Sequence, residues 1–145
     1  MTRRAIFVSL CLLASVHCGD NPGGPSGQNL TGTWVGLFSD SGNTTGRLTW
    51  LLTHSGSQLT GTMSGNDTVS GVLTFSNATT TGSVTGSSLT SVWTFPLGSV
   101  VLLPNCAATI NAQASVSNNT MTGTYSGTNT CTGPVTNGQF SLTKQ

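Results

Sequence analysis

The side chains able to do acid–base or metal chemistry are few in this sequence and lie far apart. Beyond residue 17 it contains one histidine, His54, three aspartates, Asp20, Asp40 and Asp67, and no glutamate. A catalytic pair of carboxylates or a Ser–His–Asp triad would have to be assembled from these residues. No Gly-x-Ser-x-Gly turn and no glycine-rich loop at the start of a helix accompanies them. We therefore expect no enzyme and no cofactor, and we interpret His54 as a packed or rim residue of a strand.

The four cysteines have different surroundings. Cys11 lies in an apolar N-terminal run, and Cys18 follows that run. Cys106 and Cys131 remain as one pair, and disulfides persist outside the cytosol. A metal site at this pair is not expected, because no second cysteine lies two residues from either one and His54 is the only histidine left after the leader. We therefore predict a Cys106–Cys131 disulfide and no metal.

The N-terminus has the pattern of a secretory signal peptide. Arg3 and Arg4 precede an almost uninterrupted apolar run at residues 5–16. A signal peptide has such a charged start and an apolar core of about 7–15 residues, whereas a membrane-spanning helix needs about 20. We predict a signal peptide over residues 1–17 and export of the chain.

Cys18 falls where such a leader is cut, and residues 18–29 are rich in Gly and Pro. The arrangement resembles the signal of bacterial lipoproteins, in which the cysteine is lipidated and becomes the new N-terminus. The resemblance implies a lipid on Cys18, a tether over residues 18–29, and membrane anchoring in the bacterial envelope. Gly19 rather than Asp after the cysteine favours the outer membrane or cell surface over the inner membrane. The alternative is ordinary cleavage nearby, with Cys18 removed or left as a free thiol.

Charge is scarce throughout the chain. Charged residues make up 5% of it, against about 25% in an average soluble domain. Arg47 and Lys144 are the only Lys or Arg residues after residue 18, so the sequence offers no basic surface for nucleic acid. The apolar residues alternate regularly, which separates this composition from that of a disordered segment. We interpret the chain as folded β structure and exclude nucleic acid as a partner.

One short pattern recurs along the chain and organises it. Leu-Thr-Gly-Thr-Trp at residues 30–34 returns as Leu-Thr-Gly-Thr-Met at 59–63 and as Met-Thr-Gly-Thr-Tyr at 121–125. Each copy alternates large apolar residues with Thr, which is the period-2 pattern of a strand with one buried face. The central Gly falls on the buried side, where a strand can bend sharply or approach another backbone. Recurrent strands with short polar turns predict an up-and-down antiparallel barrel.

The domain at residues 30–145 is therefore predicted to be all-β, an antiparallel meander of about eight strands in a closed or nearly closed barrel. Residues 96–105 contain Pro96, Gly98 and Pro104, which exclude a central strand, and we expect a loop that covers one barrel end. A barrel of about eight strands is filled by side chains or holds one small ligand. The expected strands are 30–38, 47–54, 57–64, 69–75, 81–85, 89–95, 106–116, 120–126 and 139–143.

Residues 32–34 (Gly-Thr-Trp) in the first expected strand and 59–62 (Leu-Thr-Gly-Thr) in the third are similar to motifs of the calycin barrels, the lipocalins and avidins. The resemblance implies a meander barrel with a small-molecule site inside. In an avidin-like site, residues 39–41 (Ser-Asp-Ser) would supply the polar groups after the first strand. Met63 stands in place of the tyrosine of avidins, and no Asp lies near the C-terminus, so biotin is not the expected ligand.

Two functions stay open at this point. The first is an envelope lipoprotein whose barrel, filled by its own side chains, is a structural or interaction module for another envelope protein. The second is a lipocalin-like protein that binds a small apolar ligand inside the barrel. The residues expected to line such a site are Trp34, Trp50, Trp93, Phe75 and Tyr125.

Overall fold

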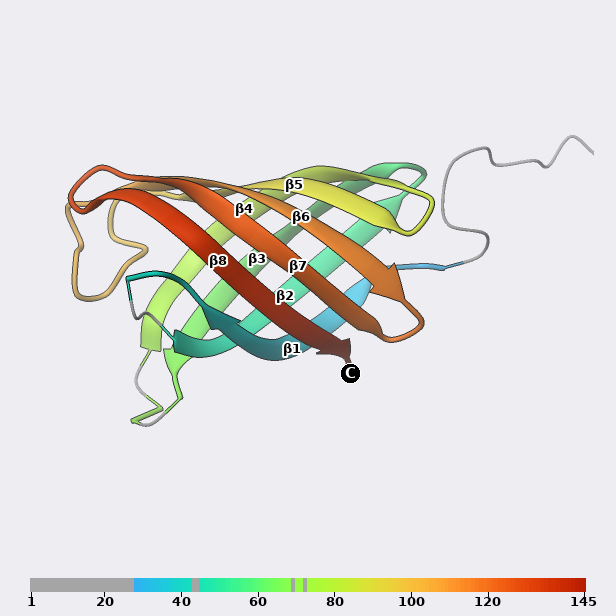
Figure 1. Cartoon of the computed structure of the whole chain (residues 1–145), viewed down its shortest axis with the longest axis horizontal. Coiled ribbons are helices and arrows are strands. Elements are labelled where there is room, and N and C mark those ends of the chain that lie inside the picture. The colour runs from blue at the N-terminus through green and yellow to red at the C-terminus, as the bar shows by residue number, and fades with distance from the viewer. Residues whose placement is uncertain (1–27, 43–44, 69, 72) are drawn as a thin grey trace, which may run out of the picture.

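The computed structural model describes residues 28–42, 45–68, 70–71 and 73–145. In these residues eight antiparallel strands follow one another around a closed barrel, which β1 and β8 complete by pairing with each other (Figure 1). The predicted all-β, up-and-down barrel is confirmed. The predicted signal peptide at 1–17, Cys18 and residues 18–27 of the tether lie outside the described residues. The strands are β1 (Gly32–Ser39), β2 (Thr45–Ser55), β3 (Gln58–Asp67), β4 (Leu73–Thr85), β5 (Ser88–Phe95), β6 (Ala108–Ser117), β7 (Thr120–Asn129) and β8 (Gly133–Lys144).

Alternating side chains produce the barrel wall. β5 and β6 alternate strictly between buried and exposed residues, and the exposed positions are mostly Thr, Ser, Asn and Gln. Thr suits such positions because its branched Cβ packs well on a pleated surface. A Cβ on the central glycine of two repeats, Gly61 or Gly123, would overlap a backbone oxygen of the neighbouring strand, that of Leu51 or Gln113. These glycines let adjacent strands coil closely around the barrel.

The structure corrects the expected strands at residues 69–85. Residues 69–75 and 81–85, expected as two strands, contribute to a single strand, β4. Asn77 has a φ of 57°, a left-handed conformation that Asn tolerates. The register between β3 and β4 shifts in the same region, between Met63 and Gly65. A β-bulge therefore bends this strand without ending it.

The start of the last strand also differs from the expectation of residue 139. β8 begins at Gly133, and Asn137 within it has a φ of 55°. The β7–β8 register shifts between Tyr125 and Gly127. Gly, Pro and Asn are turn residues in most sequences, but here a second bulge accommodates them inside the sheet.

The predicted loop at residues 96–105 joins β5 to β6 and folds against the first half of β4. Val100 forms an isolated β-bridge with Phe75. The backbone N–H of Ser76 donates to the carbonyl of Ser99 at 2.9 Å. The loop therefore continues the wall of the barrel where β5 has ended.

A disulfide holds the end of this loop in place. Cys106, just before β6, is joined to Cys131 in the β7–β8 turn, with the two Cα atoms 5.6 Å apart. This supports the predicted pairing. The bridge fixes the β5–β6 loop to the neighbouring connection at the same end of the barrel.

One end of the barrel, here called the closed end, is fully packed. Trp34 Nε1 donates to the carbonyl of Leu30 at 2.9 Å, and Leu30 N donates to His54 Nδ1 at 3.4 Å. Lys144 Nζ donates to the carbonyl of Asn29 at 2.6 Å, so the segment before β1 is fastened across this end. The buried apolar residues here are Leu30, Trp34, Leu52, Leu59, Val84, Leu89, Val116, Met121 and Leu142.

The opposite end, here called the mouth, is surrounded by the β1–β2, β3–β4, β5–β6 and β7–β8 connections, at the left of Figure 1. The apolar side chains near it are packed less completely: Phe38, Phe75, Val100 and Val135 are only partly buried. Among the described residues, no helix is long and apolar enough to cross a membrane.

Candidate functional site

The barrel interior is hollow at the mouth. A cavity of about 400 Å³ lies there, bounded by the barrel wall and the β5–β6 loop. Small-molecule sites are typically concave and mostly apolar, with volumes of about 300–1,000 Å³. The cavity has this size and character. Its aromatic lining residues are Phe38, Phe75, Trp93, Phe95 and Tyr125.

The hollow arises from the way in which three of these rings are placed. Each ring faces a glycine on the neighbouring strand, and a Cβ on that glycine would overlap the ring. The ring therefore folds sideways against the wall and leaves the barrel axis open, an arrangement in which an aromatic residue covers a glycine of the adjacent strand. The pairs are Phe38 with Gly46, Phe75 with Gly65, and Tyr125 with Gly138.

Trp93 forms the floor of the cavity and separates it from the packed half. Its ring centroid lies 5.4 Å from that of Trp50, 5.4 Å from that of Phe140 and 5.3 Å from that of Tyr125. Trp93 Nε1 donates to Ser91 Oγ at 2.9 Å. These contacts fix the indole in one orientation at the boundary between the cavity and the packed core.

Polar groups are concentrated at the rim of the cavity. The carboxylate of Asp40 accepts a hydrogen bond from Gly42 N at 2.8 Å, and the side-chain oxygen of Asn129 accepts one from Cys131 N at 2.8 Å. Thr74 also borders the cavity, and its Oγ1 is buried without a hydrogen-bond partner among the described residues.

Tyr125 is a titratable side chain of the cavity wall. Burial raises the pKa of its hydroxyl well above the usual range, and the nearby carboxylate of Asp40 raises it further. The phenol is therefore neutral at physiological pH and able to donate one hydrogen bond.

The structure brings three of the five predicted ligand-lining residues together. Phe75, Trp93 and Tyr125 line the cavity. Trp34 lies at the closed end and is fully buried, and Trp50 lies behind Trp93, away from the hollow. Asp40, one of the polar residues expected after the first strand of an avidin-like site, also lines the cavity, whereas Phe38 and Phe95 line it without having been predicted from the sequence. Their position next to the loops that end β1 and β5 is the signal that would have indicated them.

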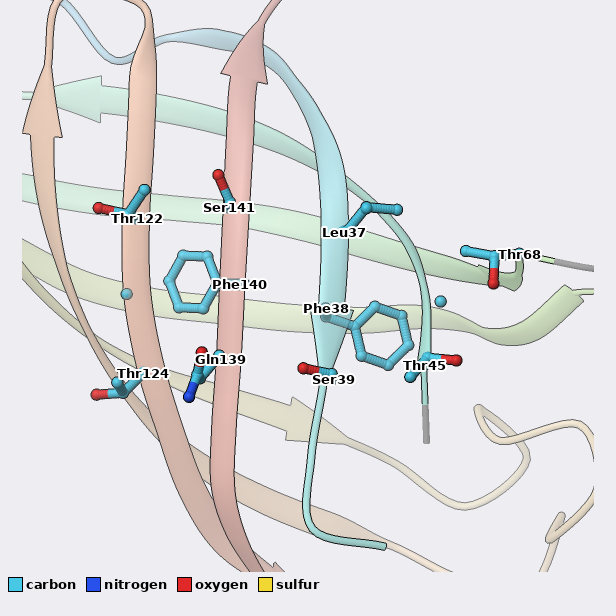
Figure 2. Close-up of a pocket in the computed structure, with 12 residues that line it drawn as sticks. Leu37, Phe38, Ser39, Thr45, Thr68, Thr122, Thr124, Gln139, Phe140 and Ser141 are labelled. Carbon is cyan, nitrogen blue, oxygen red and sulfur yellow. The ribbon is translucent and has the colours of Figure 1, made fainter. Parts of the chain in front are cut away.

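A second hollow lies on the outer wall of the barrel, across β7, β8 and β1 (Figure 2). Outward side chains of these strands, including Thr122, Gln139 and Ser141, border it, and the rings of Phe38 and Phe140 lie at its base. This groove is shallow and open, and none of the residues that line it titrates. It offers less enclosure than the mouth, so we take the mouth cavity as the candidate site.

The described residues show no metal centre and no catalytic grouping at the mouth. No cluster of three or more His, Cys, Asp or Glu residues able to hold a metal occurs among them. His54 lies at the closed end, where its Nδ1 accepts the hydrogen bond from Leu30 N. The arrangement at the mouth therefore suits non-covalent binding, with aromatic faces inside and polar groups at the rim.

No family model and no curated protein sequence matches this chain. Among solved structures the chain is similar to a redesigned β-barrel, with a TM-score of 0.52, 18% identity, and coverage of 80% of this chain and 91% of the other. It is also similar to mFAP1, a redesigned β-barrel bound to DFHBI, with a TM-score of 0.53, 19% identity, and coverage of 79% and 94%. At this level of identity the likeness is one of fold.

Proposed function

We propose that this chain is an exported envelope lipoprotein whose barrel binds a small, largely apolar ligand in the mouth cavity. The observation that carries the proposal is the hollow of about 400 Å³ walled by aromatic side chains. A barrel that served only as a structural support would be more stable if side chains filled this volume, because atoms that line an empty apolar space lose van der Waals contacts. Binding rather than catalysis is the role that the site favours, because no His, Cys, Glu, Lys or Arg occurs among the described residues that line the cavity.

In this proposal Trp93 contacts the inner end of the ligand, while Phe75 and Tyr125 contact its sides. Trp34 and Trp50 do not line the cavity, and they act by keeping the remainder of the barrel packed and rigid. The redesigned barrel mFAP1 is bound to the small molecule DFHBI, which supports a barrel of this size as a scaffold for a small-ligand site.

The first experiment is native mass spectrometry of the chain purified from its own host, compared with the denatured mass of the same sample. Extra mass that disappears on denaturation is the expected result. A neutral apolar probe, neopentylbenzene, is then titrated while tryptophan emission is recorded, because Trp93 forms the cavity floor. If no bound mass is found and tryptophan emission does not change with the probe, ligand binding is contradicted.

Two substitutions on β6 localise the binding. Ala108 lines the cavity, and the next residue, Thr109, points to the outside of the barrel. Ala108→Phe places a ring in the hollow and should abolish the response to the probe. Thr109→Phe adds the same ring to the outer wall and should leave the response unchanged. Equal responses in both variants would place the probe elsewhere.

The anchor is tested separately from the cavity. Cys18→Ser removes the predicted lipid attachment site, so the variant should move from the membrane fraction to the soluble fraction of the envelope. The wild-type chain should stay with the outer membrane or cell surface. A wild-type chain in the soluble fraction, or a Cys18→Ser variant that stays with the membrane, would contradict the anchor.

A second candidate function, contact with another envelope protein, is favoured by the β5–β6 loop. Leu97, Val101 and Leu102 on this loop are 69%, 46% and 83% exposed, and neighbouring apolar exposure often marks an interaction site. A photo-reactive phenylalanine in place of Leu102 should cross-link one specific protein in intact cells. The same group in place of Leu51, an exposed residue on the β2 wall, is the matched control.

A further inference from the structure

A row of three phenylalanine rings covers one side of the mouth cavity. The ring centroids of Phe38 and Phe75 lie 5.9 Å apart, and those of Phe75 and Phe95 lie 5.2 Å apart. Both contacts are edge-to-face, with interplanar angles of 63° and 74°. All three residues line the cavity, so a ligand on this side contacts aromatic rings.

The row forms because two of its rings lean toward each other over glycines. Phe38 on β1 and Phe75 on β4 belong to strands that are separated by β2 and β3. A Cβ on Gly46 of β2 would overlap the ring of Phe38, and a Cβ on Gly65 of β3 would overlap the ring of Phe75. The two glycines therefore leave room for the rings, which meet across two strands and form one continuous aromatic wall.

A second aromatic pair borders the same cavity. Trp93 and Tyr125 have ring centroids 5.3 Å apart and planes tilted by 39°, and both residues line the cavity. Aromatic pairs prefer centroid separations of about 4.5–7 Å and contribute more than the area that they bury. The pairs at the cavity already have such separations, so a ligand ring finds its neighbouring rings in place.

The lining offers no free counter-charge to a charged ligand. No Lys, Arg or His occurs among the described residues that line the cavity. Asp40 at the rim is engaged within the chain, by the hydrogen bond from Gly42 N and by a further interaction. Tyr125 stays neutral because burial raises the pKa of its hydroxyl. An ion that entered the cavity would lose hydration without gaining a partner of opposite charge, which is costly.

From the ring arrangement and the lack of a free counter-charge in the described lining, we infer that the ligand is an uncharged molecule with an aromatic ring. The inference rests on the proposed function and names the chemical class of its ligand. The ligand ring lies against the phenylalanine row and the Trp93–Tyr125 pair, and it extends their ring-to-ring contacts into the cavity.

Four probes of similar shape separate aromatic character from charge. Neopentylbenzene is neutral and aromatic, neopentylcyclohexane is its saturated counterpart, and benzyltrimethylammonium and phenylmethanesulfonate are a cation and an anion. Each is titrated into the full chain while tryptophan emission is recorded. We expect neopentylbenzene to bind at least about fivefold more tightly than neopentylcyclohexane and at least about tenfold more tightly than either ion. A cavity without a preference for rings would favour the saturated probe, because that probe is the more hydrophobic of the two.

The role of the phenylalanine row is tested by Phe75→Leu, which removes the central ring and retains an apolar side chain. The variant should bind neopentylbenzene about threefold to tenfold more weakly, while its affinity for neopentylcyclohexane changes by less than about twofold. Ile110→Val is the matched control, because Ile110 is an aliphatic residue of the same lining and the loss of one methyl group should affect both probes alike. Thermal unfolding of both variants shows whether the fold is intact.

The outcomes separate this inference from the proposed function. Equal or tighter binding of neopentylcyclohexane, or a preference for neopentylbenzene that survives unchanged in Phe75→Leu, overturns the inference and leaves ligand binding standing. Tighter binding of either ion overturns it as well. If none of the four probes binds to the folded wild-type chain, the cavity is not a site of this kind and both statements fail.

Discussion

The closed end and the mouth of this barrel are built from the same strands, yet one is filled and the other is hollow. At the closed end, Trp34 and Met121 from two copies of the recurring pattern lie fully buried beside Leu30. At the mouth, the rings of Phe38 and Phe75 are only partly buried and lie against the wall. The strands thus define a cylinder, and the local partners of the inward side chains decide whether it is filled.

The connections explain why the segment before β1 closes only one end. The β2–β3, β4–β5 and β6–β7 turns at the closed end have two residues each, and their first residues, Gly56, Gly86 and Asn118, have positive φ angles, as tight hairpins require. These short turns do not cover the end of the barrel, and the side chain of Leu30, from the segment before β1, fills it instead. At the mouth the connections are longer, and the β5–β6 loop extends the wall around an open space.

The largest expected effect comes from truncating a ring at each end. Trp34→Ala removes a fully buried side chain and its hydrogen bond to Leu30, and we expect a loss of about 3–5 kcal/mol in the free energy of unfolding. Phe75→Ala at the mouth should cost about 1–2 kcal/mol, because part of that ring already faces the cavity. Urea unfolding of both variants measures the difference. Equal losses would mean that the mouth is as tightly packed as the closed end.

Removal of the disulfide should lower the stability of the domain and loosen the mouth more than the closed end. Cys106 and Cys131 are separated by 25 residues, and a loop of about this length corresponds to about 3.5 kcal/mol in the loop-entropy model. We expect the free energy of unfolding of the double variant Cys106→Ser/Cys131→Ser to fall by up to about 3.5 kcal/mol. Amide hydrogen exchange should accelerate at the mouth ends of β6 and β7, while the amides near Trp34 stay protected. A uniform acceleration would show that the two ends unfold as one unit.

A matched pair of alanines on β6 compares the two packing states directly. Ala108 and Ala112 both point inward, but Ala108 lines the cavity and Ala112 does not. Ala112→Leu inserts atoms into packed space and should cost about 1–3 kcal/mol of unfolding free energy. Ala108→Leu fills the hollow, so stability should change by less than about 1 kcal/mol. If Ala108→Leu proves the more destabilising of the two, the mouth has no free volume at that position.

Much of this fold could be predicted from the sequence, because the wall depends on local patterns. The alternation in β5 and β6 fixes which side chains point inward, and the repeat at residues 30–34, 59–63 and 121–125 indicates several similar strands. The disulfide partners follow from the positions of the cysteines. These features depend on spacing along the chain, which a sequence displays directly.

The hollow could not be predicted in the same way, because it depends on pairing between strands. An inward Phe75 looks the same in the sequence whether its ring fills the barrel axis or covers a glycine. Its position opposite Gly65 depends on the register shift between β3 and β4, which Asn77 and the bulge set. For the same reason Trp34 and Trp93 appear equivalent as inward tryptophans, although only Trp93 reaches the cavity.

The smallest expected effect concerns Tyr125, which lies where the filled and hollow halves meet and is the only tyrosine of the chain. Burial, with a further contribution from Asp40, raises the pKa of this phenol in the folded chain. The unfolded chain has an ordinary tyrosine pKa of about 10. Above that pH the unfolded chain therefore releases a proton that the folded chain keeps. The unfolded state then binds fewer protons, so the free energy of unfolding should fall as pH rises above about 10, by at most about 1.4 kcal/mol per pH unit for this group. Phenolate absorbance of the folded chain should appear only well above that pH, and Tyr125→Phe should lose both the absorbance and this part of the pH dependence. Phenolate formation near pH 10 in the folded chain would instead mean that water fills the cavity down to Tyr125, and the boundary between the two halves would then lie deeper, at Trp93.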